Sequence, residues 1–454
     1  MAIRLGTCLI LLLLMNVTES GLSFPKCDSV CPTPSDYPDR DLGSVPQSLP
    51  ASVDGLCLDD HAIVSLKQSD FSKYTNIIFI CLRRNSITNI TIGTFPNLTE
   101  RWRLDLTSNQ INSIQAGSFS NLPQLKALIL AFNQITSIQP GSFSNLPRLV
   151  RLDLPHNQLT CIQPGVFSDL PKLLTLDLSN NQICNIQPGS FSNLPRLSRL
   201  DLTSNQISCL QPGLFTNLPG LRWLLLSMNQ IDNIQSGTFV NLPQLECLGL
   251  NSNHISNIQN GIFLNLPKLN TLLLDKNQIK VLPYNFLMLI TTVNLKNNPW
   301  QCDCRMVPIR QKMIWAVASQ IRCREPSRFW GQKLTDINPE DLLCEEARIV
   351  RFEVVGGNST LVKEETLVLV CEASGIPTPD ITVTLPSGQN VTVESGGRVT
   401  VDVNGTIAIT NVTAAADAGL YICIAANPVG STTAKQVVDV QMLTSAHTST
   451  SVLV

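Results

Sequence analysis

The chain has 454 residues, which is long enough for two or three domains. Its 32 basic and 34 acidic side chains nearly cancel, so charge gives no indication of nucleic acid or of a strongly anionic membrane as a partner. Aromatic residues make up only 5% of the chain, and we therefore expect mainly aliphatic cores.

Residues 1–20 have the pattern of an export signal. Arg4 precedes an apolar run from Leu9 to Met15, and small residues near Ser20 favour cleavage before Gly21. No later stretch has the length of a membrane span, and residues 443–454 are predicted to be a flexible tail. We predict a protein secreted to the extracellular space. The alternatives are a retained signal anchor and a truncated form of a membrane-anchored protein.

Cysteine content agrees with that compartment. Of the fifteen cysteines, fourteen remain when Cys8 of the signal is set aside, and an even number suits an oxidising environment. Six Asn-x-Ser/Thr acceptors also follow the signal. They predict N-glycosylation at Asn89, Asn97, Asn358, Asn390, Asn404 and Asn411.

A strict 24-residue period organises residues 53–298, in about 11 repeats. Asparagine recurs from Asn85 to Asn277 within the pattern LxxLxLxxNxI, with His61 and Asn298 at the ends, and a phenylalanine follows ten residues after each site from His61 to Asn253. The pattern resembles the leucine-rich-repeat family. That resemblance implies an α/β-type solenoid with a parallel sheet on its concave face, a buried ladder of asparagine hydrogen bonds and a spine of phenylalanines on the convex side.

Solenoid ends need caps, and cysteines mark both ends. Residues 21–52 are the expected N-terminal cap region, and residues 299–346, with NPWQCDC, resemble the family's cysteine-rich C-terminal cap. That resemblance implies the disulfides Cys302–Cys323 and Cys304–Cys344. A zinc site is disfavoured, because the motif lacks CxxC pairs, and no metal or cofactor is expected.

Cys57 and Cys81 occupy the outward position of two neighbouring strands. Parallel strands bring such residues to ~5 Å, within disulfide reach, so we predict a Cys57–Cys81 bridge. The remaining cysteines have no assigned pairing: Cys27, Cys31, Cys161, Cys184, Cys209 and Cys247.

The period changes to two from about Ile349. The segments CEASGIPTP, NGTIAITNV and DAGLYICIAANPVG resemble an intermediate-set immunoglobulin domain over residues 349–442, an all-β sandwich. The resemblance implies a Cys371–Cys423 disulfide, a tyrosine corner at Tyr421 and an ion pair between Arg398 and Asp417. One departure is Val383, which stands where the family usually has its core tryptophan.

Catalytic motifs are missing from the sequence. The four histidines form no HExxH, and there is no GxSxG and no phosphate loop, so we expect no enzyme activity and no cofactor. We expect His156 to be a single exposed side chain. An aspartate stripe recurs in the repeats and is interpreted as repeat consensus rather than a calcium site: Asp105, Asp153, Asp177 and Asp201.

Two rows of outward positions differ in how much they vary. The residue after the first leucine is different in all nine repeats from Ile78 to Asn270, whereas glutamine recurs seven times in a row from Gln115 to Gln259. We interpret the varied row as a concave face diversified for recognition. The alternative is that an amide ladder holds the glutamines while the sheet face drifts.

Apolar side chains on that face are the candidate anchors for a partner: Trp102, Ile129, Phe132, Trp223, Leu225 and Met228. Arginines flank the first group and would suit an acidic partner: Arg83, Arg84 and Arg103.

The order of modules resembles that of chordate and neural proteins used in adhesion and receptor modulation. It implies an extracellular protein or a cell-surface glycoprotein as the partner. The alternatives are an innate immune molecule that recognises microbial surface ligands, and a structural spacer of the extracellular matrix. Enzyme activity would require a catalytic domain outside this chain, as in peroxidasin-type proteins. The oligomeric state is left open.

Overall fold

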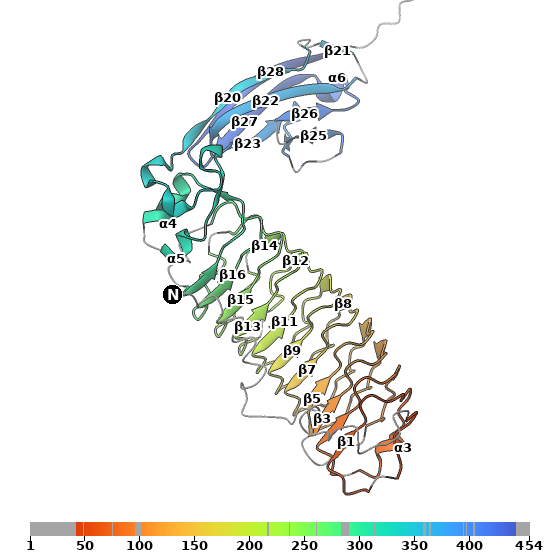
Figure 1. Ribbon diagram of the computed structural model, residues 1–454. Helices are drawn as coiled ribbons and strands as arrows, with labels where there is room; N and C mark the ends of the chain where they lie inside the picture. The colour runs from red at the N-terminus through yellow and green to blue at the C-terminus, as the bar shows by residue number, and fades with distance from the viewer. Residues whose placement is uncertain are drawn as a thin grey trace, which may run out of the picture. The chain divides into compact units, whose positions relative to one another are not determined.

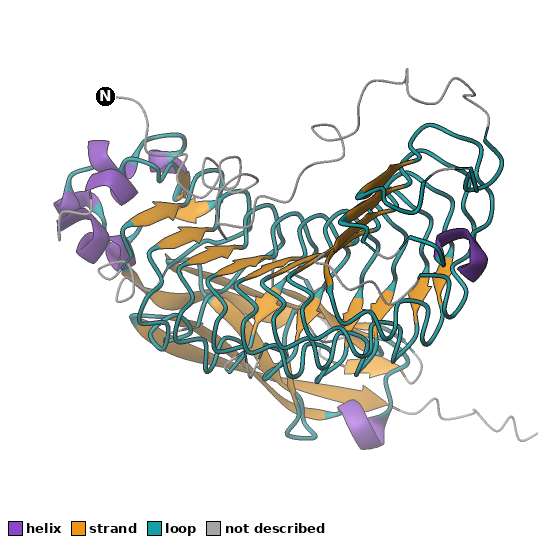
Figure 2. Ribbon diagram, turned by 90° about the horizontal axis from the view of Figure 1, so that it is seen from below, coloured by secondary structure: helices purple, strands orange, loops and turns teal. Residues whose placement is uncertain are grey.

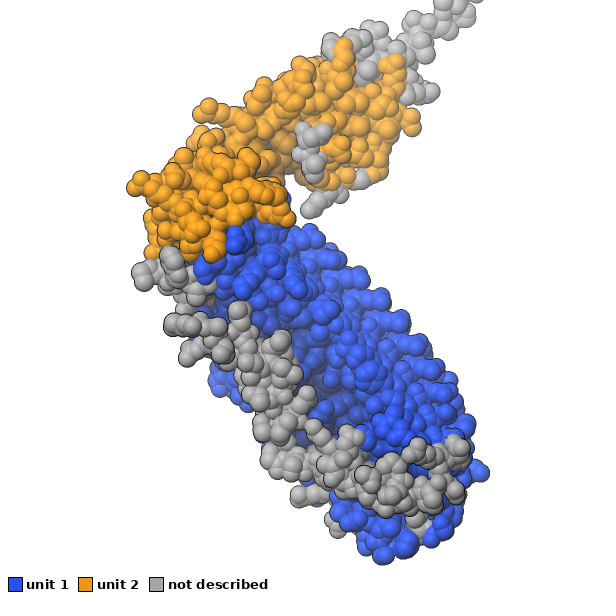
Figure 3. Space-filling view, in the orientation of Figure 1, with its two compact units in different colours: residues 1–300, 314–322 blue, residues 301–313, 323–454 orange. Residues whose placement is uncertain are grey.

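The protein is described by a computed structural model over residues 42–48, 50–74, 76–95, 102–215, 218–235, 237–259, 261–282, 290–311, 315–356, 360–362, 365–393, 395, 397–402 and 405–441. Two compact units divide the chain: Met1–Trp300 with Ile314–Arg322, and Gln301–Met313 with Cys323–Val454 (Figure 3). The predicted export signal, Cys27, Cys31 and the acceptors Asn97, Asn358 and Asn404 lie outside the described residues. Within the described ranges, no helix is long and apolar enough to cross a membrane.

The first unit is built on one parallel sheet of short strands, which lie side by side in Figures 1 and 2. Neighbouring strands pair with a 24-residue offset, as in Leu176 with Leu200, so each repeat contributes the same strand. The middle residue of each three-residue strand points into the core, and the two outer residues point to the opposite side, which we call the sheet face. In order the strands are β1 (Gly55–Cys57), β2 (Phe79–Cys81), β3 (Trp102–Asp105), β5 (Leu125–Ile129), β7 (Arg151–Asp153), β9 (Thr175–Asp177), β11 (Arg199–Asp201), β13 (Trp223–Leu225), β15 (Cys247–Gly249), β16 (Thr271–Leu273) and β17 (Thr292–Asn294).

The repeated asparagines form the predicted hydrogen-bond ladder. Asn181 is typical: its Oδ1 accepts from the backbone N–H of Leu159 at 3.0 Å, and its Nδ2 donates to the carbonyls of Leu154 at 3.0 Å and Leu178 at 3.1 Å. The same bonds recur from Asn109 to Asn277. Each asparagine therefore satisfies buried backbone groups in its own turn and in the preceding turn, which the apolar core cannot do.

The recurring phenylalanines stack into the expected spine. From Phe95 to Phe263 successive ring centroids lie 6.0–6.4 Å apart with nearly parallel planes. The turn before each ring contains a glycine with positive φ, as at Gly165 (φ +80°), where most side chains would be strained. Small elements complete this unit: α3 (Gln68–Phe71), and the strand pairs β4 (Ser113–Ile114) with β6 (Ser137–Ile138), β8 (Cys161–Ile162) with β10 (Asn185–Ile186), and β12 (Cys209–Leu210) with β14 (Asn233–Ile234).

Two disulfides organise the cysteine-rich segment that follows the repeats. Cys302 is bonded to Cys323, and Cys304 to Cys344, with Cα atoms 5.6 and 5.3 Å apart. Both pairings are those implied by the family resemblance. The segment contains β18 (Trp300–Gln301), η3 (Cys304–Met306), α4 (Val307–Gln311), α5 (Trp315–Ala318), β19 (Cys323–Glu325), η4 (Ser327–Phe329), η5 (Leu334–Asp336) and η6 (Pro339–Asp341).

The rest of the second unit is a two-sheet antiparallel sandwich. One sheet orders β20 (Glu345–Val354), β22 (Leu367–Ile376), β26 (Thr406–Ile409) and β25 (Val399–Val401). The other orders β21 (Thr360–Val362), β28 (Gly430–Gln441), β27 (Gly419–Asn427), β23 (Asp380–Thr384) and β24 (Asn390–Val391), with β21 parallel to β28. The short helix α6 (Ala414–Asp417) precedes β27.

The sandwich contains the groups that the immunoglobulin resemblance implies. Cys371 and Cys423 form a disulfide between the two sheets. The Tyr421 hydroxyl donates to the Asp417 carbonyl at 2.8 Å, and Arg398 pairs with the Asp417 carboxylate at 2.8 Å. Val383 is fully buried within the apolar core that surrounds this disulfide. A valine therefore takes the place of the usual tryptophan without opening the core to solvent.

Candidate ligand-binding face

Charged side chains occupy the middle of the sheet face in a repeating arrangement. Because side chains two apart on a strand share a face, the tripeptide Arg-Leu-Asp places a guanidinium beside a carboxylate. Arg103 with Asp105, and Arg199 with Asp201, form such pairs at 2.9 Å; Arg151 and Asp153 form one at 2.6 Å. Of these arginines, only Arg103 was among the predicted site residues, and the pairing itself was not predicted, although the repeated RLD tripeptide was the available signal.

Two positions break this arrangement on adjacent strands. Thr175 replaces the arginine in β9, so Asp177 has no guanidinium from its own strand. Asp177 still accepts from the backbone N–H of Ser179 at 3.0 Å, as Asp201 does from Thr203. Asp153 has no such donor, because the residue two positions later is Pro155, which lacks an N–H. Oδ1 of Asp153 is buried and has no hydrogen-bond partner.

The interrupted row concentrates negative charge. Asp153, Asp177 and Asp201 lie opposite one another on three neighbouring strands. Burial, together with the charges of Asp201 and Asp153, raises the pKa of Asp177 to about 6. Burial also raises the pKa of Asp153, against the opposing effect of Arg151. These three carboxylates have two guanidiniums on their own strands, those of Arg151 and Arg199, and the charge of Arg103 on the next strand also acts on Asp153.

An exposed aromatic pair borders the charged patch. The rings of Phe132 and His156 stack with centroids 4.1 Å apart and planes 10° from parallel. Phe132 is 53% exposed and His156 is also exposed, so neither ring contributes much to the core. Both residues have positive φ, +54° each, as do the residues at the same position of the other described repeats, so the repeat framework sets this conformation. His156 is thus not the isolated side chain that we expected.

Four of the six apolar candidates are buried, which corrects the expectation of exposed anchors. Trp102 is 1% exposed: the register shifts by one residue at this point, so Trp102 pairs with the core residue Leu125 and packs near Phe95. Arg101 stands at the position where the repeats from Leu125 to Leu269 have leucine, and the apolar Trp102 next to it fills the core better than a charged group.

The other three buried candidates lie on the sheet face but are covered by their neighbours. Trp223 and Leu225, 7% and 4% exposed, pack together with Cys247, and Arg222 lies over the Trp223 ring at 4.5 Å. Ile129 packs between two small residues of its own chain segment and is 6% exposed. Phe132 and Met228, at 53% and 56%, are the two candidates that are open to solvent.

The predicted arginines all have acidic partners within the chain. Arg83 contacts Asp59 at 2.7 Å, Arg84 pairs with Asp60, and Arg103 pairs with Asp105. These internal pairs neutralise the positive charge that was expected to meet an acidic ligand. The expected acidic partner therefore has no support from this surface.

The two rows compared in the sequence also differ in the structure. The seven glutamines from Gln115 to Gln259 are all exposed, and within the described ranges no hydrogen bond joins two of them. In the varied row, Arg222 and Glu246 form an ion pair at 2.9 Å, whereas Lys126 is buried. The interpretation of the glutamines as a mutual amide ladder therefore has no support.

Cysteines and glycan acceptors lie at three kinds of position. Cys57 and Cys81 are opposite in register and both are disulfide-bonded, as is Cys247, while the bridge between Cys57 and Cys81 stays a prediction. Exposed free thiols lie elsewhere on the repeats: Cys161, Cys184 and Cys209. The acceptors that the structure describes are all exposed: Asn89, Asn390 and Asn411.

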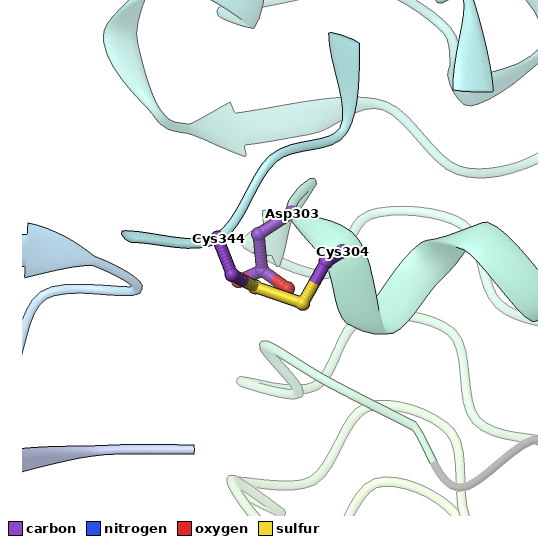
Figure 4. A group of neighbouring side chains, drawn as sticks. All are labelled: Asp303, Cys304 and Cys344. Carbon is purple, nitrogen blue, oxygen red and sulfur yellow. A yellow bond between two sulfur atoms is a disulfide. The ribbon is translucent and has the colours of Figure 1, made fainter. Parts of the chain in front are cut away.

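One group of side chains has a composition that suits a metal, and Figure 4 shows why we do not interpret it as a metal site. Asp303, Cys304 and Cys344 lie close together, but the two sulfurs are bonded to each other and cannot act as thiolate ligands. Asp303 is fully buried, pairs with Arg305 and accepts from its backbone N–H at 3.0 Å. The group therefore caps η3 and closes the cysteine-rich segment.

Comparison with known proteins agrees with both parts of the fold. Residues 80–255 match the leucine rich repeat family in five overlapping stretches, and residues 352–427 match the immunoglobulin domain family. The chain therefore contains leucine-rich repeats and an immunoglobulin domain.

Curated relatives match about a third of the chain. Leucine-rich repeat and fibronectin type-III domain-containing protein 5 of Homo sapiens is 30% identical over 150 residues, 33% of this chain and 20% of that protein. Leucine-rich repeat and fibronectin type III domain-containing protein 1 of Rattus norvegicus is 27% identical over 143 residues, which are 32% of this chain and 18% of that protein. Peroxidasin homolog of Mus musculus is 31% identical over 150 residues, 31% and 10%. The chain thus spans a fifth or less of these relatives.

Two solved structures share the fold. One is a chain of the octameric complex of Latrophilin 3, Unc5D and FLRT2 (LRR), with a TM-score of 0.57 and 25% identity over 66% of this chain and 94% of that chain. The other is a chain of the Toll–Spatzle complex, with a TM-score of 0.50 and 20% identity over 70% and 51%. Their resemblance supports the stacked-repeat architecture.

Proposed function

We propose that this chain is a non-catalytic extracellular recognition protein, and that it binds a protein partner through the concave sheet face of its repeats. The observation that carries the proposal is the exposed pair Phe132 and His156 beside the aspartate row. Exposed aromatic groups next to charged groups are frequent binding anchors. The two exposed rings add little to the core, so packing within the fold does not account for their apolar character.

The comparisons support this proposal at the level of the class. Both structural neighbours come from protein–protein complexes, and one of these includes FLRT2 (LRR). We propose a cell-surface or secreted protein as the partner, in adhesion or receptor modulation. Export to the extracellular space is supported by the six glycosylation acceptors and by disulfides such as Cys302–Cys323.

A binding screen of the secreted chain against a panel of extracellular domains tests the proposal. Saturable binding to one domain is expected, and the variants Phe132→Ala and His156→Ala should weaken it by about ten-fold or more. Leu264→Ala is the matched control, because Leu264 is an exposed apolar residue (46%) in a turn away from the sheet. Equal loss in all three variants, or no loss in any, would contradict binding through the sheet face.

A further inference from the structure

A basic loop with an exposed tryptophan lies in the cysteine-rich segment of the second unit. Residues 323–333, which we call the basic loop, carry three cations and one anion: Arg324, Arg328, Lys333 and Glu325. Trp330 of this loop is 61% exposed, whereas Trp102, Trp223 and Trp300 are buried. The loop therefore presents positive charge and a large aromatic ring to solvent at the same place.

Hydrogen bonds and a buried ring hold the loop in place. The Cys323 N–H donates to the Gln332 carbonyl at 2.9 Å, and the Gly331 N–H donates to the Cys323 carbonyl at 2.8 Å, so the loop is closed at its base. Cys323 also belongs to a disulfide, and Phe329 packs into the interior with 8% of its surface exposed. Its neighbour Trp330 adds little to this packing, because most of the indole faces solvent.

The cations of the basic loop have no carboxylate partner. The Arg324 guanidinium lies over the Trp330 ring, 4.4 Å from its centroid. Arg328 donates from Nη2 to a neutral acceptor, the backbone carbonyl of Asp341, at 3.2 Å. Arg324, Arg328 and Lys333 are all exposed, and among the residues that the structure describes none of them forms an ion pair. Arginines of the sheet face are neutralised by aspartates, whereas these positive charges stay available to a ligand.

Acidic side chains limit where an anionic ligand can lie. Glu325 is within the loop, and η6 carries Glu340 and Asp341; all three are exposed. Arg328 contacts the backbone of Asp341, so η6 borders the loop at Arg328. We therefore expect an anion on the side of the loop where Arg324 lies over Trp330.

We propose that the basic loop binds a sulfated polysaccharide of the heparin class. Guanidinium groups bind tetrahedral oxyanions such as sulfate through parallel N–H bonds, and the stacked indole holds one guanidinium in a fixed orientation. The flat apolar face of a sugar ring can pack against the exposed indole, so one ligand uses both the cations and the ring. This site goes beyond the proposed function and relies on it only for the extracellular location.

Two other polyanions fit this surface less well. Anionic lipids are concentrated in the cytoplasmic leaflet of membranes, which an exported chain does not meet. An acidic protein segment supplies carboxylates, but it offers no repeating flat ring for Trp330. A sulfated polysaccharide supplies both groups along its whole length, and clusters of basic residues are a known signal for such ligands.

Binding of the full secreted chain to immobilised heparin, followed by surface plasmon resonance, tests the site. The double variant Arg324→Gln with Arg328→Gln should weaken binding by about ten-fold or more, since two charged contacts are lost. Arg148→Gln with Arg196→Gln is the matched control, because it makes the same change in net charge at two exposed arginines of the repeats and should leave the affinity unchanged. If the control weakens binding as much, heparin responds only to net charge and the site is refuted.

The tryptophan gives a second measurement that does not change the charge. Trp330→Ala should weaken heparin binding by about three-fold or more, and Trp330→Phe should recover most of that loss because it keeps an aromatic ring. The indole is exposed, so both variants should keep the melting temperature of the unmodified chain. Unchanged heparin affinity in a folded Trp330→Ala variant would remove the ring from the site and contradict the proposal.

Salt and competing polyanions identify the ligand. Heparin binding should weaken as sodium chloride increases, and this dependence should be less steep in the double arginine variant, because fewer counterions are released. Polyglutamate, and vesicles of equimolar phosphatidylcholine and phosphatidylserine, should bind more weakly than heparin. Tighter binding of either one would assign the loop to an acidic protein or to a membrane and overturn the proposal.

The basic loop and the sheet face can be tested separately. Phe132→Ala should leave heparin binding unchanged, and the double arginine variant should keep its affinity for a protein bound at the sheet face. Loss of heparin binding in Phe132→Ala would place the polysaccharide elsewhere and refute the basic loop as its site. A chain that binds a protein partner but not heparin would also refute the loop site, and it would leave the proposed function intact.

Discussion

Removing one asparagine of the ladder is the sharpest test of how the repeats are held together. Asn181 is 8% exposed, and its side chain joins two neighbouring turns of the stack. In Asn181→Ala the N–H of Leu159 loses its acceptor. The carbonyls of Leu154 and Leu178 each keep one donor, because Asn157 also donates to Leu154 and Asn205 to Leu178.

The cost follows from this inventory. One buried N–H left without a partner costs about 1–3 kcal/mol, since its desolvation is not compensated. Nδ2 also donates to the carbonyls of Leu154, Leu178 and Ser179, which all keep another donor, and each of its two N–H groups contributes about 0.5–1.5 kcal/mol. We therefore expect Asn181→Ala to lower the free energy of unfolding by about 2–5 kcal/mol.

Urea denaturation of the repeats, followed by far-ultraviolet circular dichroism, measures this loss. Asn185→Ala is the matched control, because Asn185 undergoes the same chemical change at an exposed site four residues away and should cost less than about 0.5 kcal/mol. Asn181→Asp should be least stable at neutral pH, and it should recover as the pH falls and the carboxyl group regains a donor. If the free energies of unfolding of the two alanine variants differ by less than about 1 kcal/mol, the asparagine ladder does not stabilise the repeats as proposed.

Three further predictions concern other parts of the chain. Trp102→Ala should lower the free energy of unfolding by about 3–5 kcal/mol and leave partner affinity per folded molecule unchanged; affinity loss in a fully stable variant would contradict its burial. Burial acts to raise the pKa of Asp417, but hydrogen bonds from Arg398 and Thr413 outweigh it and hold that pKa below its usual range. The sandwich should therefore gain stability from Asp417 above pH ~4 and lose it as the pH falls further. Arg398→Met should lower the free energy of unfolding by about 1–3 kcal/mol at pH 7. Calorimetry of that variant should also show a smaller loss of stability between pH ~4 and lower pH than the unmodified chain shows. Maleimide labelling of the native protein, with peptide mapping, should modify the exposed thiols within minutes, and labelling only after unfolding would contradict their exposure: Cys161, Cys184 and Cys209.

The repeat pattern predicted the stack because each framework position has one physical task. Leucines of the strand, ladder asparagines and spine phenylalanines recur at fixed spacing, and spacing is what places them in space. The pattern failed at Trp102, where counting from Asn109 assigned an outward position. Arg101 occupies a leucine position there, and the strand shifts by one residue so that an apolar ring enters the core. Such a shift depends on the neighbouring turns, and the local pattern does not contain them.

Exposure on the sheet face was harder to predict for a related reason. Trp223 and Leu225 point outward as expected, but neighbouring side chains cover them. Predicting their exposure requires the size and the direction of the side chain 24 residues away, at the same position of the next repeat. Phe132 and Met228 stay open because they stand at the strand ends, where the chain turns away with positive φ. Alternation decides the face of a side chain, whereas burial depends on what the adjacent repeats carry.

The strict framework also explains why single departures on the sheet face are informative. The asparagine ladder satisfies the buried backbone groups, and the phenylalanine spine packs the core, whatever the outward residues are. An arginine, a threonine or a proline can therefore stand on the sheet face with little effect on the stacking of the repeats. Within a row of complete Arg–Asp units, Thr175 and Pro155 remove one donor each from neighbouring aspartates. Unused acceptors beside a carboxylate of raised pKa are a cost to the isolated chain.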